Sequence, residues 1–268
     1  MIINQITKWA NKHNIPIVFN AVGIEGYNIK DPRCQILKKA INRKCIQSIS
    51  TRDNINSLNN DYIVNKKIET RQVADPALWT KECYNIRKKE SNIIGIGVIR
   101  PEIFKDYLYD IKEKELLKLF SEIIIKLQAQ NYNIKLFTNG VKKDMDFIYK
   151  LKDYMKTEKN FEKMIIERPT TTKELVNTIA SFKMTIGTRL HSNIISYSLD
   201  VPTISIVWNM KQLYFSQLNS IEEFFITKEN FNSDYILNKV ELIHKQKKLD
   251  RKYKNSAYLF IRDIIKKL

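Results

Sequence analysis

The stretch that decides the fold is SFKMTIGTRLHSNIISYSLDVPTISIVWNMK, residues 181–211. An apolar run ends at Gly187, and Thr188-Arg189-Leu190-His191 follows it directly. Apolar residues then recur at helical spacing until about Asp200, and a β-branched run over 203–208 has the length of a buried strand. This order predicts a parallel strand–helix–strand unit. It places an arginine and a histidine at a helix N-terminus beyond a strand end, where open α/β sheets bind ligands and anions are favoured.

The region before this stretch, from residue 91, continues the same alternation of strands and helices. The expected elements are strand 92–99, helix 113–130, strand 134–137, helix 144–157, strand 164–167 and a helix capped by Thr171. Strands that alternate with helices of this length indicate parallel pairing, and the crossovers place the strand ends along one edge. We therefore expect residues 91–245 to form a Rossmann-like domain.

The shared edge of that sheet collects polar side chains from distant parts of the chain. Arg100 follows the first strand, and Arg189 and His191 follow the strand that ends at Gly187. Further candidates for this rim are Arg168, Asn209 and Lys211. An arginine fork binds phosphate or carboxylate through two parallel hydrogen bonds. Any one of these arginines alone is better explained as a solvated surface residue or as part of a structural ion pair, so only their convergence predicts an anion site.

The first 85 residues predict a smaller and incomplete α/β domain with three short strands. The strands are expected at 17–19, at 46–50 and just before Asp75, and Asp53 or Asn54 is expected to cap a short helix. The polar segment 83–91 is the expected linker. Residues 246–268 form an amphipathic helix whose apolar stripe is expected to dock on a neighbouring domain, with a membrane surface as the alternative.

Composition limits the classes of partner. The chain has 46 Lys and Arg against 29 Asp and Glu, a net charge of +17, which indicates an anionic partner or a general bias toward lysine. No nucleic-acid-binding motif accompanies the lysines, so no nucleic-acid partner is expected. The three cysteines have no metal-ligand spacing, so no metal is expected. The sequence shows neither a secretory signal nor a 20-residue apolar run, which indicates a cytoplasmic protein; peripheral contact with the inner membrane face is a further expectation.

Four stretches of the sequence form a recognisable set: GTRLHSNIISYSLDVPTISIVWNMK (187–211), supported by IGIGVIR (94–100), STRD (50–53) and VADPALW (73–79). In these stretches the sequence resembles the polysaccharide pyruvyl transferase family. The resemblance implies a fold of two Rossmann-like parallel-sheet domains of glycosyltransferase-B type. Members of this family usually begin with further βα units that carry a glycine-rich loop. We therefore expect the N-terminal domain of this chain to lack them.

The resemblance also implies a reaction, the transfer of a pyruvyl ketal group from phosphoenolpyruvate to a sugar of a cell-surface polysaccharide or exopolysaccharide. In the family the donor is associated with the residues that match Arg100, Arg189, Leu190 and His191 here, and we expect His191 to act as the acid. The acceptor would be a glycan or a lipid-linked oligosaccharide, and no cofactor is implied. An aspartate is common at the position of Asn209, so no carboxylate role is carried over to it.

Two other functions stay open from the sequence. One is a nucleotide-sugar-dependent glycosyltransferase of the same fold, which would use the basic rim for a diphosphate. The other is an inactive, truncated remnant that binds an anion or a glycan.

Overall fold

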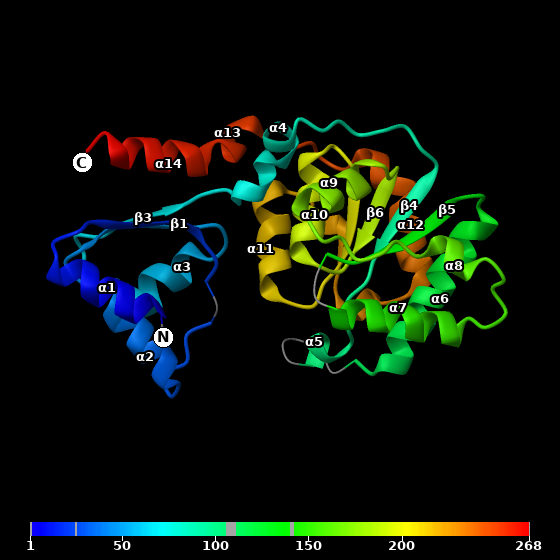
Figure 1. The fold of residues 1–268 in the computed structure, drawn as a ribbon, viewed down its shortest axis with the longest axis horizontal. Coiled ribbons are helices and arrows are strands. Elements are labelled where there is room, and N and C mark those ends of the chain that lie inside the picture. Colours follow the sequence, from blue (N-terminus) through cyan, green and yellow to red (C-terminus); the bar gives the residue numbers. More distant parts are fainter. Residues whose placement is uncertain (1, 25, 106–110, 140–141, 268) are drawn as a thin grey trace. The chain divides into compact units, whose positions relative to one another are not determined.

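The computed structural model describes residues 2–24, 26–105, 111–139 and 142–267, and the chain divides into two compact units. Unit 1 comprises residues 1–76 and 250–268, and unit 2 comprises residues 77–249 (Figure 1). This division differs from the expected ranges 1–85, 91–245 and 246–268. The chain passes from unit 1 to unit 2 at Pro76, and it returns to unit 1 at Asp250.

The segment expected to be a linker, 83–91, lies within unit 2. Tyr84 and Ile86 pack against an apolar cluster of that unit, and the backbone N–H of Lys89 donates to the carbonyl of Ala180 at 2.8 Å. The sequence pattern predicts a linker here because most residues of this segment are polar or charged, and its two packing residues do not form an apolar run.

Unit 1 is built on a three-stranded parallel sheet in the order β1-β2-β3. Its elements are α1 (Ile2–Lys12), β1 (Ile17–Val22), α2 (Pro32–Ile41), β2 (Ile46–Thr51), α3 (Ile55–Ser57), a π-helical turn (Leu58–Tyr62), β3 (Glu69–Gln72), α13 (Arg251–Lys254) and α14 (Ser256–Ile265). Successive side chains of β1 point to opposite faces of the sheet: Ile17 and Phe19 pack in one cluster, and Val18 packs in the other.

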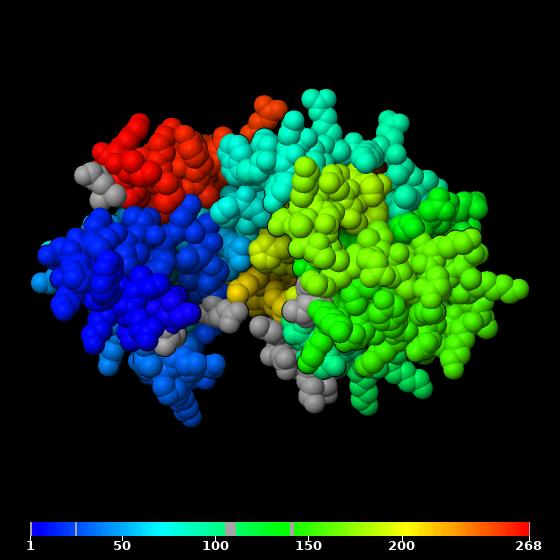
Figure 2. Space-filling view, viewed as in Figure 1, coloured from blue at the N-terminus to red at the C-terminus, as the bar shows by residue number. Residues whose placement is uncertain are grey.

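The last helix, α14, covers the face of this sheet that Val18 occupies. Its stripe residues Ala257, Phe260 and Ile264 are buried together with Ala21 and Val73. In Figure 2 the red atoms of this segment lie against the blue atoms of the N-terminal part of the chain. The amphipathic pattern therefore reflects docking on unit 1, as expected, and the helix is part of that unit rather than a separate element.

Unit 2 is a five-stranded, wholly parallel sheet in the order β5-β4-β6-β7-β8. Its strands are β4 (Ile93–Gly97), β5 (Asn133–Phe137), β6 (Met184–Gly187), β7 (Thr203–Ile206) and β8 (Phe225–Ile226). Its helices are α4 (Thr80–Tyr84), α5 (Glu102–Lys105), α6 (Glu113–Ala129), α7 (Lys142–Tyr154), α8 (Phe161–Met164), α9 (Thr172–Ala180), α10 (Leu190–Ser198), α11 (Met210–Asn219) and α12 (Ser233–Leu242). Short 3-10 turns complete the chain at Pro76–Trp79, Glu222–Phe224, Lys228–Asn230 and Ile243–Lys245.

The helices form layers on the two faces of this sheet. Helices α9 and α10 pack together on one face, and α6 and α12 pack together on the other (Figure 1). The strand register pairs Gly97 with both Phe137 and Gly187, and Gly187 with Ser205. Four strands therefore end at the same level, and the residues that follow them meet at one edge.

One predicted strand is wrong. Met164 instead ends α8, and the rest of the segment 164–167 makes a single bridge, between Ile165 and Leu136. The predicted cap of the next helix is confirmed: the hydroxyl of Thr171 accepts from the backbone N–H of Glu174 at 3.2 Å.

Candidate functional site

The carboxyl edge of the five-stranded sheet is held in place by hydrogen bonds to Thr188. Its N–H and its hydroxyl both donate to the carbonyl of Gly97, at 3.0 and 2.8 Å. Its own carbonyl accepts from the indole of Trp208 at 2.6 Å and from the amide of Gln212 at 3.1 Å. These bonds join the ends of β4, β6 and β7, so the next residue, Arg189, starts from a fixed backbone position as the N-cap of α10.

Gln212 is the centre of this polar core and is completely buried. Besides Thr188, its amide nitrogen donates to the hydroxyl of Ser205 at 2.8 Å and to the carbonyl of Ile206 at 3.2 Å. Its amide oxygen accepts from the backbone N–H of Trp208 at 3.0 Å. A buried amide with all of these partners fixes the geometry of the strand ends, because each partner would be costly to leave unpaired.

Helix α10 approaches the sheet closely through small and polar side chains. Asn193 is fully buried and donates to the hydroxyl of Ser205 at 2.7 Å, while the hydroxyl of Thr203 donates to its amide oxygen at 3.0 Å. A Cβ atom on Gly187 would lie 2.1 Å from that amide oxygen. Only glycine therefore fits at position 187, directly before the arginine–leucine–histidine motif.

The guanidinium of Arg189 is paired with Asp144, whose side chain is completely buried. Nε of Arg189 donates to Oδ2 of Asp144 at 2.7 Å, and Nη2 lies 2.5 Å from the same oxygen. The other oxygen, Oδ1, accepts from the backbone N–H of Arg100 at 3.2 Å and lies 3.7 Å from Nη1 of that residue. One carboxylate therefore joins two arginines that are 89 positions apart, and this cluster of three side chains carries a net charge of +1.

A buried hydroxyl follows the end of β5. Thr138 is 1% exposed, and among the described residues its Oγ1 has no hydrogen-bond partner. Native proteins leave few such groups unpaired, so a buried, unpaired hydroxyl at a strand end is an unusual feature.

The family was identified by comparison with known proteins. A family model described as polysaccharide pyruvyl transferase matches residues 3–210. This chain belongs to the polysaccharide pyruvyl transferase family. Comparison with curated protein sequences gave no match.

Solved structures of similar fold are glycosyltransferase-B-like. The UDP-GlcNAc 2-epimerase of Methanocaldococcus jannaschii superimposes with a TM-score of 0.66 at 13% identity, covering 98% of this chain and 74% of the epimerase. A complex of an epimerase from the same organism with UDP-GlcNAc and UDP gives 0.58 at 14% identity, covering 98% and 73%. A glycosyltransferase from Rickettsia africae ESF-5 gives 0.53 at 14% identity, covering 98% and 79%. At such identities the likeness establishes only the fold, and it confirms the predicted α/β class.

In this pyruvyl transferase family member the predicted site residues fall into two groups. Arg100 and Arg189 meet at Asp144, Leu190 and His191 open α10, and the side chain of His191 is exposed. The other rim candidates lie in different settings. Asn209 caps α11 in a capping box with Gln212, and Lys211 is partly buried in the first turn of that helix. Arg168 is exposed and follows no strand of the sheet.

The sequence interpretation of this family member missed Asp144, Thr138 and Gln212. Asp144 lies in the first turn of α7, where an acidic residue is ordinarily explained by the helix dipole. Its position soon after the end of a parallel strand, at the edge where Arg100 and Arg189 were expected, could have identified it as their partner. Thr138 and Gln212 gave no signal, because their burial depends on the packed structure.

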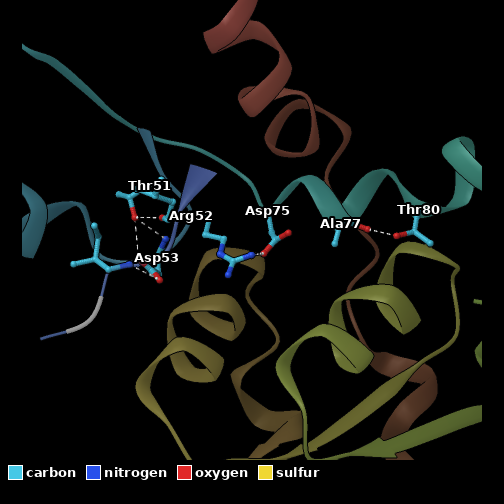
Figure 3. Close-up of polar contacts among 8 residues, drawn as sticks. Thr51, Arg52, Asp53, Asp75, Ala77 and Thr80 are labelled. Atoms are coloured by element: carbon cyan, nitrogen blue, oxygen red, sulfur yellow. Dashed lines mark hydrogen bonds and ion pairs between the residues drawn. The ribbon is translucent and has the colours of Figure 1, made fainter. Parts of the chain in front are cut away.

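A second polar cluster follows the strands of unit 1. Arg52 forms an ion pair with Asp75, and Asp53 accepts from the hydroxyl of Thr51 at 2.8 Å (Figure 3). Asp53 also accepts from the backbone N–H of Ile24 at 2.8 Å, which ties down the loop after β1. The cap of α3 is instead Asn54, which accepts from the N–H of Ser57 at 2.9 Å. The STRD motif therefore fixes the strand ends of unit 1.

Neither a cluster of metal-ligating side chains nor a membrane-spanning helix occurs among the described residues. Within residues 2–24, 26–105, 111–139 and 142–267, no group of three His, Cys, Asp or Glu side chains is placed to hold a metal ion. Across the part of the chain that the structure describes, no helix has both the length and the apolar character needed to cross a membrane.

Proposed function

We propose that this protein transfers a pyruvyl group from phosphoenolpyruvate to two hydroxyls of one sugar in a glycan or lipid-linked oligosaccharide, forming a ketal. The observation that carries the proposal is the meeting of Arg100 and Arg189 at Asp144, inside the segment that the family model matches. Phosphoenolpyruvate presents a phosphate and a carboxylate, and two guanidinium groups at one edge suit two anionic groups on one small molecule.

The reaction requires proton transfer at two places. The methylene carbon of the donor gains a proton and becomes a methyl group, while two sugar oxygens form bonds to the adjacent carbon. The bond from that carbon to the phosphate ester oxygen breaks, and inorganic phosphate leaves. Of the two protons lost by the sugar hydroxyls, one replaces the proton given to the methylene carbon and the other leaves with phosphate.

His191 is the residue we assign to the methylene proton. It is the second residue of α10 and its side chain is exposed, so a substrate at the sheet edge can reach it. An imidazole exchanges protons near neutral pH and can be recharged by a sugar hydroxyl proton. The N-terminus of α10 also favours an anionic ligand beside it.

The proposal is tested by incubating the protein with phosphoenolpyruvate and candidate glycans. The measurements are inorganic phosphate release and mass spectrometry of the glycan for a pyruvyl ketal. His191→Gln should abolish turnover and preserve phosphoenolpyruvate binding, and His244→Gln, on an exposed histidine in a 3-10 turn, is the matched control.

Three outcomes would contradict the assignment in different ways. Turnover at the wild-type rate in His191→Gln removes the acid role. Release of a nucleoside diphosphate from a nucleotide sugar, without phosphate release from phosphoenolpyruvate, replaces the proposal with a glycosyltransferase. Binding of phosphoenolpyruvate without turnover on any acceptor indicates a non-catalytic remnant.

A further inference from the structure

The two oxygens of Asp144 hold Arg189 and Arg100 in different ways. Oδ2 receives a hydrogen bond from Nε of Arg189 at 2.7 Å, with Nη2 of the same residue at 2.5 Å. Among the described residues, Oδ1 receives a hydrogen bond from the backbone N–H of Arg100 and none from its guanidinium, whose Nη1 is 3.7 Å away. A separation of 3.7 Å is an ion pair without a hydrogen bond. Asp144 therefore fixes the side chain of Arg189 and holds Arg100 by its backbone.

This arrangement also fixes which edge of Arg189 faces the carboxylate. The Nε–Nη2 edge of the guanidinium lies against Asp144, so a second anion must approach Arg189 through its remaining donors. The side chains of Arg100 and Arg189 are 28% and 21% exposed, whereas that of Asp144 is 0% exposed. Each arginine side chain is therefore partly accessible to a small anion from solvent, whereas the carboxylate between them is not.

We infer that Asp144 is a positioning residue: it orients Arg189 as a rigid half of an anion clamp and leaves the Arg100 guanidinium to close on the ligand. A buried carboxylate is costly unless it is paired, so it keeps Arg189 in place whether or not a ligand is bound. The cluster has two positive charges and one negative charge, which leaves one positive charge to be balanced by the ligand. The identity of that ligand, phosphoenolpyruvate, rests on the proposed function.

Charge and orientation make opposite predictions for Asp144→Asn. If charge alone governs binding, removing the carboxylate raises the net charge of the cluster from +1 to +2 and an anion binds more tightly. If Asp144 orients Arg189, the same change weakens binding, because the guanidinium loses its charge-assisted hydrogen bond and rotates among several positions. A residue needed only for stability would change the melting temperature and leave the affinity of the folded protein unaltered.

The affinity experiment uses isothermal titration of the full chain with phosphoenolpyruvate and, separately, with inorganic phosphate. For Asp144→Asn we expect the Kd to rise by about tenfold or more, the loss of one charge-assisted hydrogen bond. Asp146→Asn removes the same charge from an exposed position on α7 and should leave the Kd unchanged. Arg189→Lys should weaken binding strongly in the wild-type background and only slightly in Asp144→Asn. Tighter binding by Asp144→Asn, or an unchanged Kd, overturns the inference.

A second measurement uses the wild-type protein and does not depend on turnover or on the folding of the Asp144 variant. Arginine Nε–H signals are recorded by NMR and assigned with Arg189→Lys and Arg100→Lys. We expect the Arg189 signal to exchange slowly with water in the free protein, and added phosphoenolpyruvate to shift the Arg100 signal. Rapid exchange at Arg189 in the free protein overturns the inference. If wild type binds neither phosphoenolpyruvate nor phosphate while Arg189 remains protected, the proposed function fails and the positioning of Arg189 stands.

Discussion

Replacing Gly187 by alanine is the sharpest test of how the arginine–leucine–histidine motif is supported. The new Cβ would lie 2.1 Å from the amide oxygen of Asn193, a contact no structure tolerates, so the asparagine must move. Asn193 is fully buried and holds Ser205 at 2.7 Å and Thr203 at 3.0 Å. The substitution therefore acts on the hydrogen bonds between α10 and β7 as well as on packing.

The expected loss follows from these contacts. Each broken hydrogen bond to a buried partner costs about 1–3 kcal/mol, and the lower end applies because Ser205 also accepts from Gln212 and Thr203 from Thr185. Overpacking adds about 1–3 kcal/mol. The sum is about 3–5 kcal/mol, a large part of the roughly 5–15 kcal/mol that stabilises a typical domain.

The assay is urea unfolding followed by circular dichroism and tryptophan fluorescence, since the buried Trp208 lies beside the site and reports on unit 2. Gly26→Ala is the control, because its Cβ would meet no atom within 4 Å. Asn193→Ala opens the space, so Gly187→Ala should cost much less in that background. If the cost is the same with and without the asparagine side chain, the steric explanation is refuted.

Three further predictions concern groups whose burial or pairing is known. Thr138→Val removes a buried hydroxyl without a partner among the described residues and should raise the free energy of unfolding by about 1 kcal/mol in urea; a decrease would reveal a partner for the hydroxyl. Gln212→Met should lower that free energy by about 3 kcal/mol through loss of several buried hydrogen bonds, whereas Gln217→Met, at an exposed position of the same helix, should leave it unchanged. Burial raises the pKa of the Tyr62 phenol, so unfolded chains ionise first. The resulting contribution to the stability of unit 1 should be fully present below about pH 10 and be lost as pH rises further. Tyr62→Phe should weaken that alkaline dependence in pH-dependent urea melts.

The sequence predicted those elements of the fold that depend on local pattern. Apolar runs and helical spacing located β1, β2, β4, β5, β6 and β7, and the alternation of strands with helices predicted parallel pairing. The two-residue strand β8 was not predicted. The one false strand, at 164–167, shows the limit of this reasoning: an apolar run of four residues suits a strand or the end of a short helix such as α8 equally well.

Only part of the candidate site could be predicted from the sequence. Arg100 and Arg189 could be placed at one edge because chain topology determines where strand ends lie, and their meeting at Asp144 agrees with that expectation. The partner itself could not be found, because a buried carboxylate and a solvated one look alike in a sequence. Asn209 was expected at the rim because it follows a strand, and in the structure its side chain caps α11.

Unit 1 is built from two segments of the chain that are far apart in sequence, and this affects the order in which the protein can fold. Its sheet comes from residues before 77, but the helix that covers Val73 and Ala21 lies beyond residue 250. During synthesis the ribosome therefore completes all of unit 2 before it releases α14, and the growing chain exposes one apolar face of the first sheet throughout that time. Nascent chains that end before α14 should thus be chaperone clients, even though their second unit is already complete.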